Sequence, residues 1–170
     1  KLGFEIFLKR KQSQDFCFVA GNSMNAFLAK EIGVREGDIR DEQGKVLGRH
    51  KGLHFYTIGQ RKGLGLGGGP YFVTGFDVRK NVLRVSRNEK DLFRKEMGLY
   101  PCNFIGAFRR GAARVRAKVR YRQKAAPATL HVRPGNRAVL VFDKPQRAVT
   151  PGQFAVFYKG SDCLGAGEIL

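Results

Sequence analysis

The chain has 170 residues, and its 32 Lys and Arg residues against 14 Asp and Glu give a formal net charge of +18 at pH 7. Such a surplus attracts polyanions and favours a nucleic-acid partner. No stretch approaches the roughly 18 apolar residues needed to span a bilayer, and neither a long basic amphipathic helix nor a secretory signal is visible, so we expect no membrane partner.

The first half of the chain predicts a small β module with one short helix. Ser23 is placed to cap a helix that runs to about Glu31. From Gly37 the pattern changes to strands, with one hairpin over residues 37–48 around the turn at 41–44. A second and clearer hairpin covers residues 71–86 and turns at 79–81.

The second half predicts a closed β-barrel. Residues 88–98 are polar and charged, and we interpret them as the link between two β modules. Six candidate strands follow, separated by proline-containing turns, near residues 103–108, 113–121, 128–132, 138–142, 153–158 and 167–170. Six strands of this length suit a small closed barrel, so the fold is expected to be mainly β.

One stretch, residues 109–124, carries eight Lys or Arg residues and no Asp or Glu. From Arg114 the cations occupy every second position, at Arg114, Arg116, Lys118, Arg120 and Arg122. This period places them on one face of a strand, with Val115, Ala117, Val119 and Tyr121 on the other. A phosphate backbone is the natural counterpart of such a row. The alternative is a solvated edge strand whose charges oppose aggregation.

Other motifs carry less chemistry. Gly63, Gly65 and Gly68 have dinucleotide-loop spacing, but Pro70 and a strand follow them where that loop requires a helix, so we reject a nucleotide site there. The three histidines are too scattered to form a metal site with any cysteine, and none is expected. Three cysteines are too few for a disulfide framework and fit a reducing cytoplasm.

Cys17 admits two interpretations from its neighbours alone. Basic residues at positions 9–11 would stabilise its thiolate, whereas Phe16 and Phe18 favour a buried, unreactive thiol.

Four segments in one order identify a resemblance: QSQDFCFV, GRHKGLHFYTIGQRKGLG, KVRYRQ and AVTPGQFAVFYKGSDCLGAGEI. Together they resemble the C-terminal half of the tRNA-specific 2-thiouridylases of the MnmA/TrmU family, over nearly the whole chain. The resemblance implies an ATP-dependent sulfurtransferase that replaces the 2-carbonyl oxygen of the wobble uridine in tRNA with sulfur. It also likens the barrel to the second domain of translation elongation factors.

The resemblance implies specific roles for four residues. Cys17 would carry the incoming sulfur as a persulfide, and a second cysteine in an N-terminal domain would release it by forming a disulfide. Arg120, Tyr121 and Gln153 fall where the family contacts tRNA. Cys102 and Cys163 match no catalytic position.

The implied domain organisation has three parts. Residues 1–21 would be the tail of an N-terminal ATP-pyrophosphatase domain, residues 22–87 the central β module, and residues 88–170 the tRNA-binding barrel. ATP with Mg²⁺ would bind the N-terminal domain, whose phosphate loop these 170 residues lack, so we expect no cofactor here and no activity from this portion alone. The expected partners are tRNA and a sulfur-donor protein, in the cytoplasm. A non-catalytic RNA-binding barrel and an autonomous thiol enzyme that uses Cys17 without RNA remain the alternatives.

Overall fold

A computed structural model describes residues 24–106, 111–121 and 123–170. The chain forms two compact units, residues 1–35 and residues 36–170. In the first unit the predicted short helix is confirmed as α2 (Met24–Glu31), which has no fully buried residue. Ser23 lies outside the described residues, so its capping role stays a prediction.

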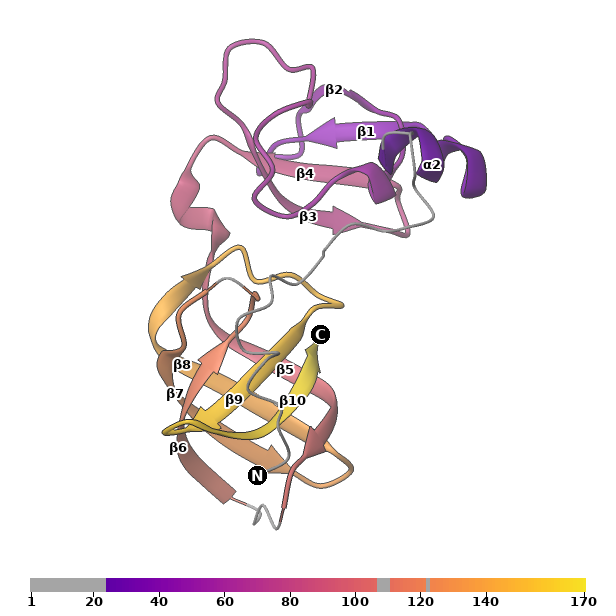
Figure 1. Ribbon diagram of the computed structural model, residues 1–170. Helices are drawn as coiled ribbons and strands as arrows, with labels where there is room; N and C mark the ends of the chain where they lie inside the picture. The colour runs from indigo at the N-terminus through magenta and orange to yellow at the C-terminus, as the bar shows by residue number, and fades with distance from the viewer. Residues whose placement is uncertain (1–23, 107–110, 122) are drawn as a thin grey trace, which may run out of the picture. The chain divides into compact units, whose positions relative to one another are not determined.

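The second unit begins with a four-stranded sheet whose strands lie in the order β2-β1-β4-β3 (Figure 1). The sheet consists of β1 (Gly37–Arg40), β2 (Val46–His50), β3 (Phe72–Asp77) and β4 (Val82–Ser86). Both predicted hairpins are confirmed, since β1 pairs antiparallel with β2 and β3 with β4. A parallel pairing of β1 with β4 joins the two hairpins. Ile39, Val73 and Leu83, all fully buried, form the centre of its core.

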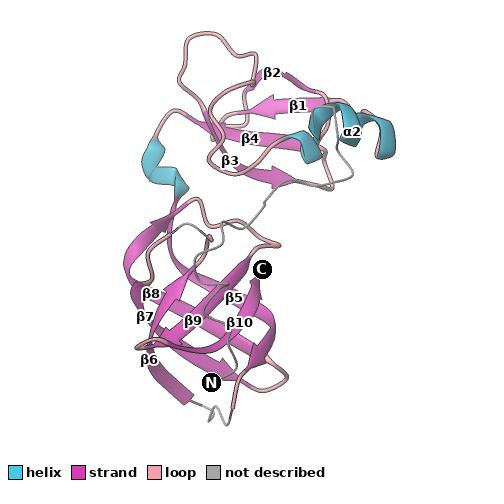
Figure 2. Ribbon diagram, viewed as in Figure 1, coloured by secondary structure: helices cyan, strands magenta, loops and turns pink. Residues whose placement is uncertain are grey.

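The predicted six-stranded barrel is also confirmed, with strands closed in the order β10-β5-β8-β7-β6-β9 (Figures 1 and 2). A short 3₁₀ turn, η3 (Glu89–Leu92), leads into it. The strands are β5 (Phe93–Phe104), β6 (Gly111–Lys118), β7 (Ala126–Arg133), β8 (Arg137–Arg147), β9 (Phe154–Lys159) and β10 (Asp162–Ile169). Inward side chains at alternate positions fill the barrel, and Leu130, Leu140, Phe142 and Phe157 are completely buried.

The prediction for the first barrel strand was wrong. We expected it at residues 103–108 and a polar link at 88–98, but β5 already begins at Phe93. Its first four residues are all exposed, so they show no alternation between apolar and polar side chains. Alternation starts only at Met97 and Leu99, which face the core. Because these first residues have no buried face, their sequence shows no strand pattern and cannot be distinguished from a polar link.

The last strand was also placed too late. We expected it at residues 167–170, whereas β10 begins at Asp162. Gly165 lies at a register shift with a φ of +143°, which obscures the strand pattern. A Cβ at Gly165 would collide with the carbonyl oxygen of Asn103, so this position requires glycine. Within the described ranges, no helix is long and apolar enough to cross a membrane.

Candidate nucleic-acid interface

Strand β6 carries the basic row that the sequence predicted. Val115, Ala117 and Val119 are at most 5% exposed and face the barrel core. Arg114 and Arg116 are exposed between them, and Lys118 is partly buried. The alternation is therefore confirmed along β6, because an apolar core and a polar exterior impose a period of two. Arg109, Arg110 and Arg122 lie outside the described residues.

The exposed cations of β6 contact the protein itself in different ways. Arg114 forms a two-pronged ion pair with Asp143, with both nitrogen–oxygen distances 2.8 Å. Arg116 donates to the carbonyl oxygen of Ala125 at 2.6 Å, and Lys118 lies over the ring of Tyr158. Among the described cations of β6, only Arg114 is therefore neutralised by a carboxylate.

The Arg114–Asp143 pair is electrostatically well matched. The Arg114 guanidinium holds the pKa of Asp143 below its ordinary range, and the same hydrogen bonds raise the pKa of Arg114. Both side chains are nonetheless exposed, at 62% and 48%. Exposed pairs gain little net free energy because water screens them, so a phosphate can compete for this arginine.

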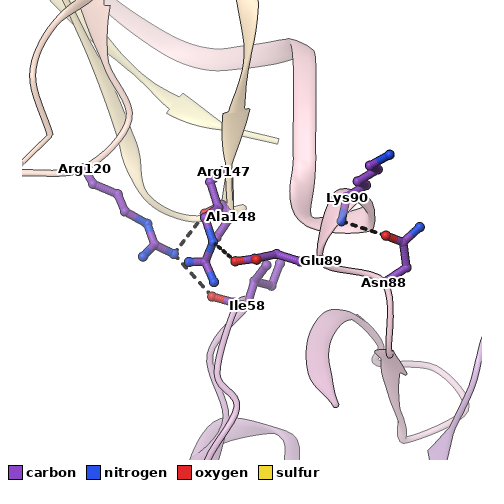
Figure 3. Close-up of polar contacts among 7 residues, drawn as sticks. All are labelled: Ile58, Asn88, Glu89, Lys90, Arg120, Arg147 and Ala148. Atoms are coloured by element: carbon purple, nitrogen blue, oxygen red, sulfur yellow. Dashed lines mark hydrogen bonds and ion pairs between the residues drawn. The ribbon is translucent and has the colours of Figure 1, made fainter. Parts of the chain in front are cut away.

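Arg120 follows β6 and contacts the loop before β3 as well as the end of β8 (Figure 3). Its Nη2 donates to the carbonyl oxygens of Ile58 at 3.2 Å and of Ala148 at 2.9 Å. The Oγ1 of Thr150 is a weaker acceptor at 3.5 Å. The Nε of Arg120 is buried and has no hydrogen-bond partner among the described residues. Arg120 is therefore less available to solvent than the sequence pattern indicated.

Apolar packing and a second ion pair surround this contact. Ile58, Leu92 and Ala148 form a buried cluster, and the amide nitrogen of Ala148 donates to the carbonyl oxygen of Leu92 at 2.8 Å. Next to Ala148, the Nε of Arg147 pairs with Glu89 at 2.9 Å (Figure 3). We call the contacts of Arg120, Ile58, Leu92 and Ala148 the Arg120 joint.

Tyr121 and Gln153, the other predicted tRNA contacts, lie in turns. Tyr121 is 63% exposed, so our placement of its ring on the apolar face of the strand was wrong, because β6 ends at Lys118 and Tyr121 lies in the turn that follows. Gln153 precedes β9, and its backbone accepts a hydrogen bond from the amide of Ile169. Its side-chain Oε1 is buried and has no hydrogen-bond partner among the described residues.

Sequence reasoning missed two aromatic side chains on β9, the strand that pairs with β6. Strand β9 pairs with β6, so that Tyr158 lies opposite Arg116. Phe154, at the start of β9, is 58% exposed. The alternation in residues 153–158 could have revealed the outward rings, but not that β9 lies next to β6. Tyr158 is partly exposed beside the cations of β6, and accessible rings near cations are typical of surfaces that contact unpaired bases.

The cysteines differ in accessibility. Cys17 lies outside the described residues, so its predicted role stays a prediction. Cys102 is 5% exposed, and burial raises the pKa of its thiol. Cys163 is exposed. Across residues 24–106, 111–121 and 123–170, no three His, Cys, Asp or Glu side chains are grouped closely enough to hold a metal ion.

The glycine-rich segment has no nucleotide-site geometry. Gly63, Gly65 and Gly68 all have positive φ angles, and the chain passes through Pro70 into β3 without an intervening helix. This segment therefore lacks the helix N-terminus that a dinucleotide loop requires.

Comparisons with known proteins agree on one family. Residues 25–87 match the model described as tRNA methyl transferase PRC-barrel domain, and residues 94–169 match the aminomethyltransferase beta-barrel domain. The tRNA-specific 2-thiouridylase MnmA of Desulforudis audaxviator is 47% identical over 93% of this chain and 47% of its own length. Proteins of the same name from Moorella thermoacetica and Desulfotalea psychrophila are 45% and 41% identical over 95% and 99% of this chain, and 46% and 49% of their own lengths.

The chain thus spans about half the length of the curated relatives that it matches. The two matched models are consecutive, and together they cover both the four-stranded sheet and the barrel. The chain belongs to the family of tRNA-specific 2-thiouridylases named MnmA and corresponds to the middle and C-terminal domains of that family.

Proposed function

We propose that the chain is the central and C-terminal part of a tRNA-modifying sulfurtransferase, which replaces the 2-carbonyl oxygen of the wobble uridine with sulfur. The observation that carries this proposal is the 40–47% identity to proteins named tRNA-specific 2-thiouridylase, over at least 93% of the chain. This part would supply the sulfur-carrying cysteine and a tRNA-binding surface. A cytoplasmic location follows from the substrate.

Cys17 is the proposed sulfur carrier. Its thiolate would attack the terminal sulfur of a persulfide on a donor protein, and the donor cysteine would leave as a thiolate. The sulfur–sulfur bond of the donor breaks as a new one forms on Cys17, so the step needs no external oxidant or reductant. Neighbouring cations at positions 9–11 favour the thiolate that this step requires. A cysteine of an N-terminal domain is proposed to release the sulfur by disulfide formation.

ATP and Mg²⁺ are proposed to bind outside this chain. The described residues offer no site for a nucleoside triphosphate. Their one glycine-rich loop, residues 63–69, leads into a strand and provides no helix N-terminus for phosphate. Activation of the uridine would therefore take place on the part of the relatives that this chain does not span.

The tRNA surface is proposed to include Tyr121 and Gln153 together with the basic row of β6, and Arg120, whose guanidinium donates to carbonyl oxygens of the protein, is proposed to shape that surface. The exposed ring of Tyr121 can stack on an unpaired base, and Arg116 and Lys118 can approach phosphates. The net charge of +18 would speed the encounter with tRNA.

A chimera tests the proposal. The chain would be joined to the N-terminal half of the Desulforudis audaxviator relative and expressed in bacteria that lack their own enzyme, and 2-thiouridine in tRNA would be measured by mass spectrometry. We expect thiolation with the native chain and none with Cys17→Ser. A folded chimera that binds tRNA without thiolating it would favour the non-catalytic RNA-binding barrel. Sulfur turnover without tRNA would favour the autonomous thiol enzyme.

A further inference from the structure

We propose that the loop of residues 57–62 is a second phosphate-binding segment for tRNA, and that Arg120 is the positioning residue that holds this loop against the barrel. The inference rests on the proposed function for the identity of the RNA. It gives the loop a role in binding and gives Arg120 a role that its place in the basic row does not suggest.

The loop is held in one conformation by its own hydrogen bonds. The amide of Gly59 donates to the carbonyl oxygen of Val73 in β3 at 2.8 Å, and the amide of Val73 donates to Gln60 at 2.9 Å. The side chain of Gln60 accepts from the amide of Thr57 at 3.1 Å and donates to the carbonyl oxygen of Lys62 at 3.0 Å. Gly59 has a φ of +86°, which favours glycine at this turn.

This fixed loop carries two cations with no carboxylate partner. Arg61 and Lys62 are both exposed, and neither forms an ion pair within the part of the chain that the structure describes. Elsewhere the second unit pairs several surface arginines with its few carboxylates, as at Arg114 and Arg147. Adjacent cations on a rigid loop repel each other unless an anion lies between or beside them, and a phosphate supplies that anion.

The Arg120 joint connects this loop to the barrel. One nitrogen of Arg120 serves the carbonyl oxygens of both Ile58, which begins the turn, and Ala148, which follows β8 (Figure 3). A Cβ on Gly59 would lie 3.0 Å from the Cβ of Ala148, so the loop backbone packs directly on the end of the barrel. Removing the guanidinium would leave the loop without its only charged hydrogen bond to the barrel among the described residues.

Chain geometry brings the loop cations near the predicted base contact. Tyr121 directly follows Arg120, and Arg61 is three residues beyond Ile58. Because three residues span at most about 11 Å, the backbone of Arg61 lies within about 11 Å of that of Ile58, which belongs to the Arg120 joint. An RNA strand that reaches the ring of Tyr121 can therefore meet the loop cations as well.

The experiment is a double-mutant cycle on RNA affinity. Binding of an unmodified tRNA transcript to the 170-residue chain would be measured by fluorescence anisotropy at several salt concentrations. The variants are the loop pair Arg61→Ala/Lys62→Ala, Arg120→Met, and the combination of all three substitutions. The pair Arg79→Ala/Lys80→Ala is the matched control, since these exposed residues of the β3–β4 turn remove the same charge.

We expect the loop pair to weaken binding by roughly three- to tenfold at low salt and to reduce the salt slope by about one to two, as the loss of phosphate contacts requires. The control pair should have a smaller effect on both. Arg120→Met should weaken binding when the loop cations are present and add little when they are absent. Thermal melting of each variant would establish that it is folded at the assay temperature.

Two results would overturn the inference while the proposed function stands. One is tRNA binding by the loop pair that equals binding by the native chain. The other is an Arg120→Met effect that adds in full to the loop pair, because additivity would mean a direct and independent phosphate contact. Failure of the native chain to bind tRNA would reject both proposals. A chimera that binds tRNA but does not thiolate it would reject only the proposed function.

Discussion

Replacing Arg120 by methionine tests the Arg120 joint through stability. The substitution removes the guanidinium and keeps much of the aliphatic stem, so the carbonyl oxygen of Ile58 loses its side-chain donor at 3.2 Å and that of Ala148 loses the donor at 2.9 Å, keeping only the hydroxyl of Thr150 at 3.0 Å. A hydrogen bond from a charged donor contributes about 1.5–3 kcal/mol. The two acceptors share one nitrogen, so their contributions do not add in full. The substitution also removes the Nε of Arg120, which is buried without a partner, and this offsets part of the loss. We therefore expect a total loss of about 2 kcal/mol in the free energy of unfolding.

Urea titration monitored by circular dichroism would measure this loss, and thermal melting should show a decrease of roughly 4–8 °C in Tm for a chain of this size. Arg116→Met is the matched control, because Arg116 is exposed on β6, just before Arg120 in the chain, and makes one hydrogen bond, to Ala125. Its effect should stay within about 0.5 kcal/mol. Equal losses in the two variants, or no loss in Arg120→Met, would contradict the claim that the hydrogen bonds of Arg120 stabilise the fold.

Three further predictions concern the barrel. Phe142→Ala should lower the free energy of unfolding by about 3–5 kcal/mol in urea titrations, because Phe142 is fully buried in the core; a loss below about 1 kcal/mol would contradict its position there. The guanidinium of Arg114 lowers the folded-state pKa of Asp143, so the ion pair stabilises the fold above the unfolded-state pKa of about 3.9 and is lost as pH falls through the folded-state pKa. Thermal melting should therefore show a shallower decline below about pH 4 for Asp143→Asn than for the native chain, and parallel curves would contradict the pairing. Tyr121→Ala should weaken tRNA binding roughly tenfold with an unchanged salt slope, since stacking involves no counterion release; a changed slope would contradict stacking.

Much of the fold could be predicted because burial imposes its period on the sequence. The basic row alternates with Val115, Ala117 and Val119, and this pattern located the strand, although β6 ends at Lys118 and not at Tyr121 as predicted. Hairpins were equally readable, since their turn residues lie between adjacent strands. The start of β5 was not readable, because its first four residues are exposed on both faces.

Contacts between distant segments could not be predicted. Barrel closure pairs β10 with β5 and β9 with β6, and nothing local specifies these neighbours. For the same reason the sequence placed Arg120 in a free basic row, whereas in the fold it binds the carbonyl oxygen of Ile58, 62 residues away. In the sequence, Arg61 and Lys62 were only part of a family motif. The structure shows that both are exposed on a loop held by hydrogen bonds.

Sulfur loading of the native chain tests the central claim most directly. The chain would be incubated with a cysteine desulfurase and free cysteine, and the peptides that contain Cys17, Cys102 and Cys163 would be compared by mass spectrometry. The exposed Cys163 and the buried Cys102 serve as internal controls for accessibility. We predict one added sulfur atom on Cys17, well in excess of that on Cys163. No sulfur on Cys17, or equal labelling of Cys17 and Cys163, would contradict a dedicated sulfur carrier.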